Sequence, residues 1–282
     1  MAFYQRRTRK NKLDLPQQLH KDILIIESLF IFLSKFDKTI IYKVDVFKMN
    51  RKKLPEWNSG MVNKILRKHP NGFVGFTIQG ERGCGKSMYA YKAMAKIYMI
   101  LDGLDECSAY EKALEHMIFE PMALIQLIKK NIKTDYITPV LCLDDATVHF
   151  NSYKFFTDLY EVILLKGMFD TIRTAVTGLL MTCPKRRNLL SFLRDYDDYK
   201  IQIKEAPGGD NYFKYARCYQ FNYYPDERKF KVIVPFQDHY SVYVPDEYYK
   251  PYMAKRKKYL ENINDRMEKL IEAKMKKRHE KQ

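Results

Sequence analysis

Apolar runs of strand length alternate with stretches of helical length through the middle of the chain. The expected strands cover 73–79, 116–119, 140–143, 174–182 and 199–203. The expected helices cover 86–101, 121–132, 153–165 and 187–194. Strands and helices that alternate at this spacing typically form a parallel sheet with helices on both faces. The pattern therefore predicts an α/β core over residues 70–206.

Different patterns flank this core. A helix over 16–36, a strand over 39–48 and a short basic helix near 61–68 predict an N-terminal α/β extension or small docking module, residues 1–69. Residues 207–245 begin with Pro-Gly-Gly, and two alternating segments within them, 212–223 and 229–234, predict a β-hairpin.

Residues 246–282 predict a long, basic C-terminal helix. Within it Leu260, Ile263, Met267 and Leu270 are spaced three or four residues apart, which places them in one apolar stripe. We expect this stripe to pack on the parent domain, and a foreign partner is the alternative.

Charge narrows the class of partner. The chain of 282 residues has 50 basic and 34 acidic side chains, a formal net charge of +16, and is 46% hydrophobic, which excludes global disorder. The bases gather at the ends, over 1–12 and 250–281. Such ends favour contacts with the phosphate backbone of DNA that do not depend on sequence, and solvated tails are the alternative.

Cysteine spacing and the N-terminal sequence bear on location. Five cysteines without a Cys-x-x-Cys pair indicate neither a disulfide framework nor a zinc site, so a reducing interior is expected. No secretory signal is visible, and the apolar stretch 23–33 contains Glu27 and is about half the roughly 20 residues of a membrane span. We expect a cytoplasmic protein without a membrane span.

The strongest chemical signal is the segment GERGCGKS, residues 80–87, between an expected strand and an expected helix. It satisfies G-x-x-x-x-G-K-[ST], the phosphate-binding loop (P-loop) in which backbone N–H groups surround a polyphosphate. Lys86 is expected to contact the β- and γ-phosphates, and Ser87 to bind Mg²⁺. The residues expected to bind ATP are Gly80, Gly83, Cys84, Gly85, Lys86, Ser87 and Met88.

A carboxylate on the metal side is expected at the end of a neighbouring strand. VLCLDD, residues 140–145, ends in two acids. We expect Asp144 to hold Mg²⁺ through water and Asp145 to orient or deprotonate the attacking water. The alternative for Asp145 is a cap on the following turn.

Three further residues are candidates with less specific signals. Thr182 ends a strand beside the expected phosphate site, which is typical of a phosphate sensor. Arg194 is the first choice among four nearby arginines for a finger that reaches a neighbouring subunit's nucleotide. Cys84 lies at a helix start, which predicts a lowered thiol pKa, although we expect a tolerated small residue rather than a nucleophile.

Together, GERGCGKS, PVLCLDDATVHF, IRTAVTGLLMTCP and RNLLSFLRDYDDYKIQI resemble the additional-strand (ASCE/AAA+-like) P-loop ATPases. More narrowly, they are similar to small ATPases of crenarchaeal viruses and plasmids, often described as similar to the initiator DnaA. The resemblance implies that 174–182 separates the two nucleotide-binding strands, that 199–203 flanks the loop strand and that 116–119 is an edge strand. It also implies a homo-oligomer inside a host cell. The chain departs from the family in having Asp145 where a glutamate is usual and a hairpin where a helical lid is usual.

Three functions are compatible with these features. The first is a Mg²⁺-dependent ATP hydrolase acting on nucleic acid, in replication initiation or DNA remodelling of a virus or plasmid. The second is a virion-assembly or genome-packaging ATPase that docks on a protein partner. The third is an ATP-bound regulatory scaffold that hydrolyses slowly, which the shorter Asp145 permits.

Overall fold

The computed structural model describes residues 59–152, 158–196, 198–206, 212–224 and 229–279. The chain divides into two compact units, Met1–Glu56 and Trp57–Gln282, and all described residues belong to the second. The expected helix over 16–36 and strand over 39–48 lie outside the described residues.

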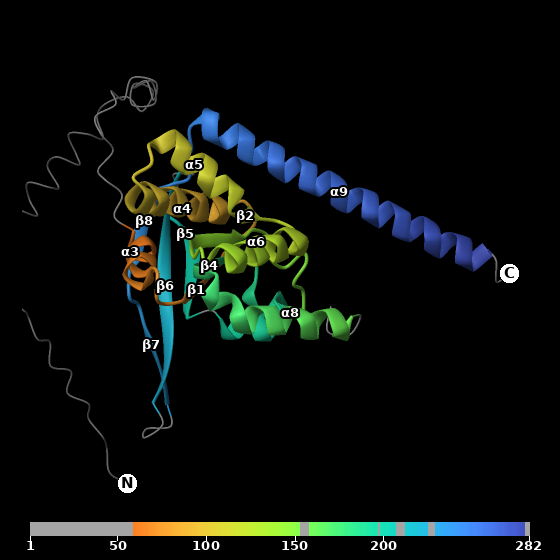
Figure 1. Ribbon diagram of the computed structural model, residues 1–282, viewed down its shortest axis with the longest axis horizontal. Coiled ribbons are helices and arrows are strands. Elements are labelled where there is room, and N and C mark those ends of the chain that lie inside the picture. Colours follow the sequence, from red (N-terminus) through yellow and green to blue (C-terminus); the bar gives the residue numbers. More distant parts are fainter. Residues whose placement is uncertain (1–58, 153–157, 197, 207–211, 225–228, 280–282) are drawn as a thin grey trace, which may run out of the picture. The chain divides into compact units, whose positions relative to one another are not determined.

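One sheet of eight strands organises the described part of the chain, in the order β2-β3-β4-β1-β5-β6-β7, with β8 paired to β6 (Figure 1). The parallel strands are β1 (Val74–Gln79), β2 (Met117–Ile118), β3 (Thr138–Leu143), β4 (Val176–Cys183) and β5 (Tyr199–Glu205). The antiparallel strands are β6 (Phe213–Tyr224), β7 (Lys229–Ile233) and β8 (Gln237–Ser241). The predicted strand order is confirmed, because β4 separates β1 from β3 and β5 flanks β1. This arrangement is the parallel sheet of a P-loop NTPase.

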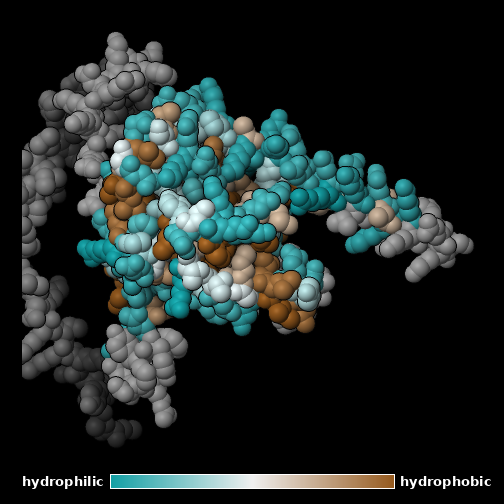
Figure 2. All heavy atoms as spheres, viewed as in Figure 1, coloured by the Kyte–Doolittle hydropathy of each residue, from teal (hydrophilic) through white to brown (hydrophobic). Residues whose placement is uncertain are grey.

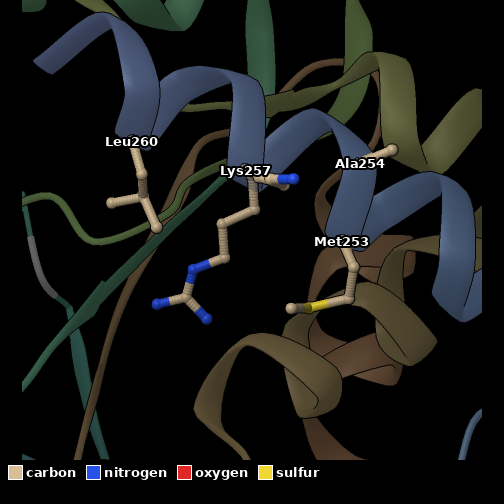
Figure 3. Close-up of a pocket in the computed structure, with 5 residues that line it drawn as sticks. Met253, Ala254, Lys257 and Leu260 are labelled. Carbon is tan, nitrogen blue, oxygen red and sulfur yellow. The ribbon is translucent and has the colours of Figure 1, made fainter. Parts of the chain in front are cut away.

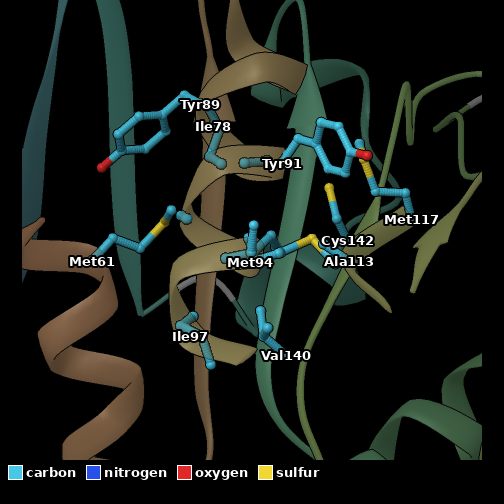
Figure 4. Close-up of a cluster of buried hydrophobic side chains, with 14 of the residues drawn as sticks. Met61, Ile78, Tyr89, Tyr91, Met94, Ile97, Ala113, Met117, Val140 and Cys142 are labelled. Atoms are coloured by element: carbon cyan, nitrogen blue, oxygen red, sulfur yellow. The ribbon is translucent and has the colours of Figure 1, made fainter. Parts of the chain in front are cut away.

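Helices cover both faces of the sheet, as predicted. One buried cluster packs α3 (Gly60–Lys68), α4 (Lys86–Asp102) and α5 (Glu106–Glu115) against β1 and β5 (Figure 4). The other packs α6 (Pro121–Thr134) and α8 (Leu159–Thr171) against β3 and β4. Adjacent strand residues alternate between the two clusters, as Leu179 and Leu180 do, because successive side chains of a strand point to opposite faces.

Local caps set the helix ends. Asp105 accepts hydrogen bonds from two backbone N–H groups at the start of α5, and Gly103 ends α4 in a left-handed conformation with φ of 63°. Pro121 begins α6, and its missing N–H costs no hydrogen bond there, because the first N–H groups of a helix have no acceptor within the helix. These signals are local, yet α5 was not among the expected helices.

A buried carboxylate attaches the C-terminal strands to the core. Asp238 on β8 accepts hydrogen bonds from Ser59 Oγ and Tyr89 Oη, both at 2.6 Å, and from the Gly60 N–H at 2.9 Å. Tyr89 belongs to α4 and Gly60 begins α3. The expected hairpin is confirmed as β6 and β7, and the additional strand β8 ties it to the parallel part of the sheet and its helices.

The C-terminal helix α9 (Asp246–His279) begins at the expected residue and contains Pro251. The expectation that its apolar stripe packs on the parent domain is wrong for Leu260 and Met267, whose exposed fractions are 45% and 55%. Ile263 does pack against the core. After this point the helix runs beyond the sheet (Figure 1), although Arg266 still forms an ion pair with Glu120 at 3.5 Å. The side chain of Leu270 lies outside what the structure describes.

Two expected helices differ from the structure. The segment 187–194 forms two 3₁₀ turns, Arg186–Asn188 and Phe192–Asp195, because its middle pairs with another loop: Leu190 N–H donates to Phe150 O at 2.9 Å. The helix expected over 153–165 is α8, which begins at Leu159 and ends at Thr171. Among the described helices, none has the length and apolar character needed to cross a bilayer.

Candidate nucleotide site

The phosphate-binding loop joins β1 to α4 and requires glycine at two positions. Gly83 and Gly85 have φ of 78° and 88°, a region that residues with a side chain rarely adopt. At Gly85, a Cβ atom would lie 2.4 Å from Val242 Cγ1, so a side chain would also collide with the segment after β8. The backbone can follow this tight path only with glycine there, and the path presents N–H groups at the start of α4.

Lys86 begins α4 and is buried, with an exposed fraction of 8%. Its ammonium donates hydrogen bonds to Gly80 O at 3.1 Å and to Glu81 O at 2.6 Å, both in the loop. The loop carbonyls therefore hold the cation at the base of the pocket, where a phosphate oxygen can compete for it.

Asp144 ends the β3 region and is fully enclosed, with an exposed fraction of 1%. Its Oδ1 accepts hydrogen bonds from Ser87 Oγ at 2.7 Å and from Thr182 Oγ1 at 2.6 Å. Burial raises the pKa of Asp144 and the nearby Asp145 carboxylate raises it further, whereas its hydrogen bonds oppose the rise. The structure thus brings together the two residues predicted to serve the metal, which are 57 positions apart.

Thr182 is buried and uses its hydroxyl to organise both acids. It donates to Asp144 and accepts the Asp145 N–H at 2.8 Å. Asp145 itself adopts a left-handed backbone with φ of 50°, which Asp and Asn tolerate better than most residues. These contacts make Thr182 a positioning residue for the acids, and its role as a phosphate sensor stays a prediction.

The C-terminal helix supplies residues that the sequence did not identify. Tyr252 donates its hydroxyl hydrogen to Asp144 Oδ2 at 3.0 Å, and Arg256 Nη2 donates to Asp145 Oδ2 at 2.6 Å. Burial raises the pKa of Tyr252, so its hydroxyl stays a donor at neutral pH. Both lie more than 100 residues from the acids, in the segment VPDEYYKPYMAKRKKY, to which the resemblance extends only loosely and without a role for either residue.

A pocket of about 440 Å³ lies between the loop and α9. Of the predicted residues, Gly83, Gly85, Lys86, Ser87, Met88 and Asp145 line it. The lining residues that sequence reasoning missed are Arg82, Pro184, Tyr249, Tyr252, Met253 and Arg256. Gly80 and Cys84 lie in the same loop, where Lys86 contacts both.

The expected pKa of Cys84 is wrong in direction. Burial raises the pKa of its thiol, and this effect exceeds the lowering by the Lys86 ammonium and the hydrogen bonds around it. Cys84 is therefore a small packed residue, as expected, and not an activated nucleophile.

Arg194 lies in the 3₁₀ turn before β5 and does not line the pocket. Its Nε is buried without a hydrogen-bond partner among the described residues, and its carbonyl accepts a hydrogen bond from Arg186. A finger acts on the nucleotide of another subunit, so the position of Arg194 outside its own pocket leaves that assignment a prediction.

The residues present fit a magnesium–nucleotide complex. A cradle of N–H groups, a buried lysine and a hydroxyl–carboxylate pair are the donor set that a polyphosphate and a hard cation require. Within the described residues, no separate cluster of three or more His, Cys, Asp or Glu side chains could hold a metal ion.

Comparison with known proteins gives viral relatives. No protein-family model matches the sequence. The chain is 26% identical to protein B-251 of Sulfolobus spindle-shape virus 1 over 230 residues, which covers 80% of this chain and 90% of that protein. It is 28% identical to protein ORF286 of Acidianus two-tailed virus over 137 residues, 47% of this chain and 44% of that protein.

Solved structures give more distant similarity. The N-terminal domain of zonular occludens toxin from Neisseria meningitidis has a TM-score of 0.38 at 14% identity, covering 64% of this chain and 98% of that one. The genome packaging NTPase B204 from Sulfolobus turreted icosahedral virus 2 has a TM-score of 0.34 at 12% identity, covering 58% and 98%. Scores this low carry no conclusion about function. The P-loop NTPase fold rests on the strand order and the loop, and the chain is similar in sequence to proteins of archaeal viruses.

Proposed function

We propose that this protein is a Mg²⁺-dependent ATP hydrolase that acts on nucleic acid. One observation carries the proposal: Ser87 and Asp144 meet at 2.7 Å beside the buried Lys86, and Asp145 lines the same pocket. The resemblance to initiator-like ATPases favours a step in replication initiation or DNA remodelling, and the viral relatives favour a role in a virus or plasmid.

The arrangement assigns a part to each side chain. Loop N–H groups and Lys86 bind the phosphate oxygens, and Ser87 with Asp144 would hold Mg²⁺, which supplies charge neutralisation. Asp145 accepts a proton from water as the water oxygen bonds to the terminal phosphorus. The bond from that phosphorus to the bridging oxygen breaks, and ADP and inorganic phosphate are released.

The charge distribution supports a nucleic-acid partner. Residues 1–12 contain five bases and no acid, and the exposed distal part of α9 adds further lysines and arginines. Release of counterions from a phosphate backbone would supply affinity that does not depend on base sequence.

The test is ATP turnover in the presence of Mg²⁺, measured alone and with single- or double-stranded DNA. We expect Lys86→Ala to lower turnover about 100-fold or more, since it removes a donor to the transferring phosphate. Lys129→Ala removes an exposed lysine of α6 and serves as the matched control. Turnover that is equal in the wild type and the Lys86→Ala variant would contradict the proposal, and stimulation by one form of DNA would identify the substrate.

An exposed apolar face favours a second candidate, an assembly or packaging ATPase that docks on a protein. Leu159, Tyr160, Ile163 and Leu164 of α8 have exposed fractions of 50–74%, and Figure 2 shows the apolar surface over this helix. Faces of this kind are typical of protein contacts. ATP turnover that is stimulated by a capsid component and not by DNA would favour this candidate. Tight ATP binding with turnover no higher than that of the Lys86→Ala variant would favour a regulatory scaffold.

A further inference from the structure

Two contacts from one helix cover the acids on which the proposed reaction depends. Tyr252 caps Asp144 Oδ2, the oxygen that Ser87 and Thr182 leave free, and Arg256 pairs with Asp145 Oδ2. Both carboxylate oxygens are therefore already engaged by side chains of α9. A water molecule has to compete with the Arg256 guanidinium at Asp145 Oδ2 and with the Tyr252 hydroxyl at Asp144 Oδ2.

The first half of α9 is anchored to the core by contacts that do not involve these acids. Tyr248 stacks on Tyr110 of α5 with ring centroids 4.3 Å apart, and Lys255 Nζ donates to Leu114 O at 2.6 Å. Tyr259 is buried with an exposed fraction of 4%. In this structure these contacts hold the first half of α9 over the pocket, with Tyr252 and Arg256 at the two acids.

The second half of α9, residues 264–279, extends beyond the core and is exposed. Met267, Ile271 and Met275 have exposed fractions of at least 51%, and Arg266 forms a surface ion pair with Glu120 at 3.5 Å. Residues 264–279 contain six basic and three acidic side chains, so this part has a net positive charge. Its composition fits a polyanion better than an acidic or neutral partner.

The surface of α9 next to the nucleotide pocket continues toward the exposed half. Met253 and Arg256 line both the nucleotide pocket and a second hollow, which Ala254, Lys257 and Leu260 complete on the same helix (Figure 3). Asn264 lies eight residues, about two helical turns, beyond Arg256, and the backbone between them is continuous helix. A tilt of the helix that lifts Tyr259 and Ile263 from the core would therefore also move Arg256.

We propose that α9 restrains the ATPase, and that nucleic acid bound to its exposed half relieves the restraint by drawing Tyr252 and Arg256 away from Asp144 and Asp145. The proposal rests on the proposed function and specifies its regulation. Coupling is reciprocal, so nucleotide that displaces Arg256 from Asp145 also strengthens binding of nucleic acid to α9.

The test compares turnover without and with DNA in variants of the full chain. Tyr252→Phe keeps the ring and removes the hydroxyl, and Arg256→Gln removes the charge. We expect each to raise DNA-free turnover at least about fivefold, toward the DNA-stimulated rate of the wild type. Arg256→Lys retains a cation and is expected to keep turnover low. Lys129→Gln, at an exposed position of α6, is the matched control for the loss of a positive charge, and its DNA-free turnover is expected to equal that of the wild type.

A chain that ends at Asn264 keeps the restraining contacts and loses most of the exposed half. We expect it to retain the low DNA-free rate and to lose stimulation by DNA. Melting temperatures of all variants separate these effects from unfolding.

The outcomes distinguish the restraint from the proposed function. Lower turnover in folded Tyr252→Phe and Arg256→Gln would show that α9 assists catalysis, and it would overturn the restraint while leaving the ATPase intact. If the wild type is active and both variants have its DNA-free turnover, the restraint is likewise overturned and the ATPase is unaffected. Stimulation of the Asn264 truncation by DNA would overturn the role of the exposed half. Turnover at the level of Lys86→Ala in the wild type and in both variants would overturn the proposed function itself.

Discussion

At the scale of single residues, Asp145 combines an unusual backbone with a chemical role. Its φ of 50° places it in the left-handed region, and its N–H is held by Thr182 while its carboxylate meets Arg256. Because Asn tolerates the same backbone, Asp145→Asn tests the carboxylate without disturbing the turn. We expect ATP binding to persist and turnover to fall about 100- to 10,000-fold, the range for loss of a general base.

A second aspartate provides the control for this prediction. Asp135 ends α6 with φ of 48° and is exposed. Asp135→Asn therefore makes the same chemical change in the same backbone conformation, away from the pocket, and turnover is expected to be unchanged. Full turnover in Asp145→Asn would remove Asp145 from the mechanism.

The residues that the sequence predicted share one property: their chemistry is visible within a short segment. GERGCGKS and the acids after β3 are recognisable because each depends on local spacing. Tyr252 and Arg256 could not be found in this way, because they meet the acids only through the packing of α9, and a tyrosine and an arginine are common residues in a basic helix. The predicted lowering of the Cys84 pKa was wrong because burial outweighed the helix start.

At the scale of elements, a single buried carboxylate joins α3, α4 and β8. Asp238→Ala removes the acceptor of three hydrogen bonds from Ser59, Gly60 and Tyr89. We expect the free energy of unfolding to fall by about 2–3 kcal/mol, because buried donors lose their partner. Denaturant unfolding measures this change.

Asp246→Ala is the control, since Asp246 is exposed and forms a surface ion pair with Lys250. An exposed pair of this kind contributes little, so its loss is expected to leave stability nearly unchanged. Equal stability of Asp238→Ala and wild type would show that β8 is not attached through this carboxylate.

The central strands were predictable because each is a compact apolar run bounded by turn residues, and their order followed from the family resemblance. The helix expected over 187–194 failed for a tertiary reason. Its leucines have helical spacing, yet Leu189 forms a β-bridge with Asn151, and Leu190 N–H donates to Phe150 O. Backbone groups that a helix would need are therefore bonded to the neighbouring loop. The strand β8 was missed because its five residues, QDHYS, have little apolar character and are fixed by Asp238.

At the scale of the whole molecule, the site is expected to depend on assembly. Arg194→Ala is predicted to lose turnover at least about 100-fold in the assembled protein, since a finger arginine stabilises charge in the transition state. Arg173→Ala, at an exposed position in the 3₁₀ turn before β4, is the control. Turnover and mass in solution are measured on the same samples, and normal turnover in an assembled Arg194→Ala protein would exclude Arg194 as the finger.

The charged ends give the molecule its expected affinity for DNA, and salt dependence measures their contribution. Residues 1–12 and 265–282 can be removed without touching the half of α9 that packs on the core. For every DNA phosphate that the shortened chain no longer binds, the magnitude of the slope of log affinity against log salt concentration is expected to fall by about 0.7–0.9.

Replacing Lys129, Lys130 and Lys133 of α6 by glutamine removes exposed charge elsewhere and serves as the control. A slope that falls in the truncated chain and not in the control places the DNA on the ends, because only released counterions change it. A slope that falls only in the α6 variant would instead place the DNA on the central domain, and it would leave the exposed half of α9 without a nucleic-acid partner.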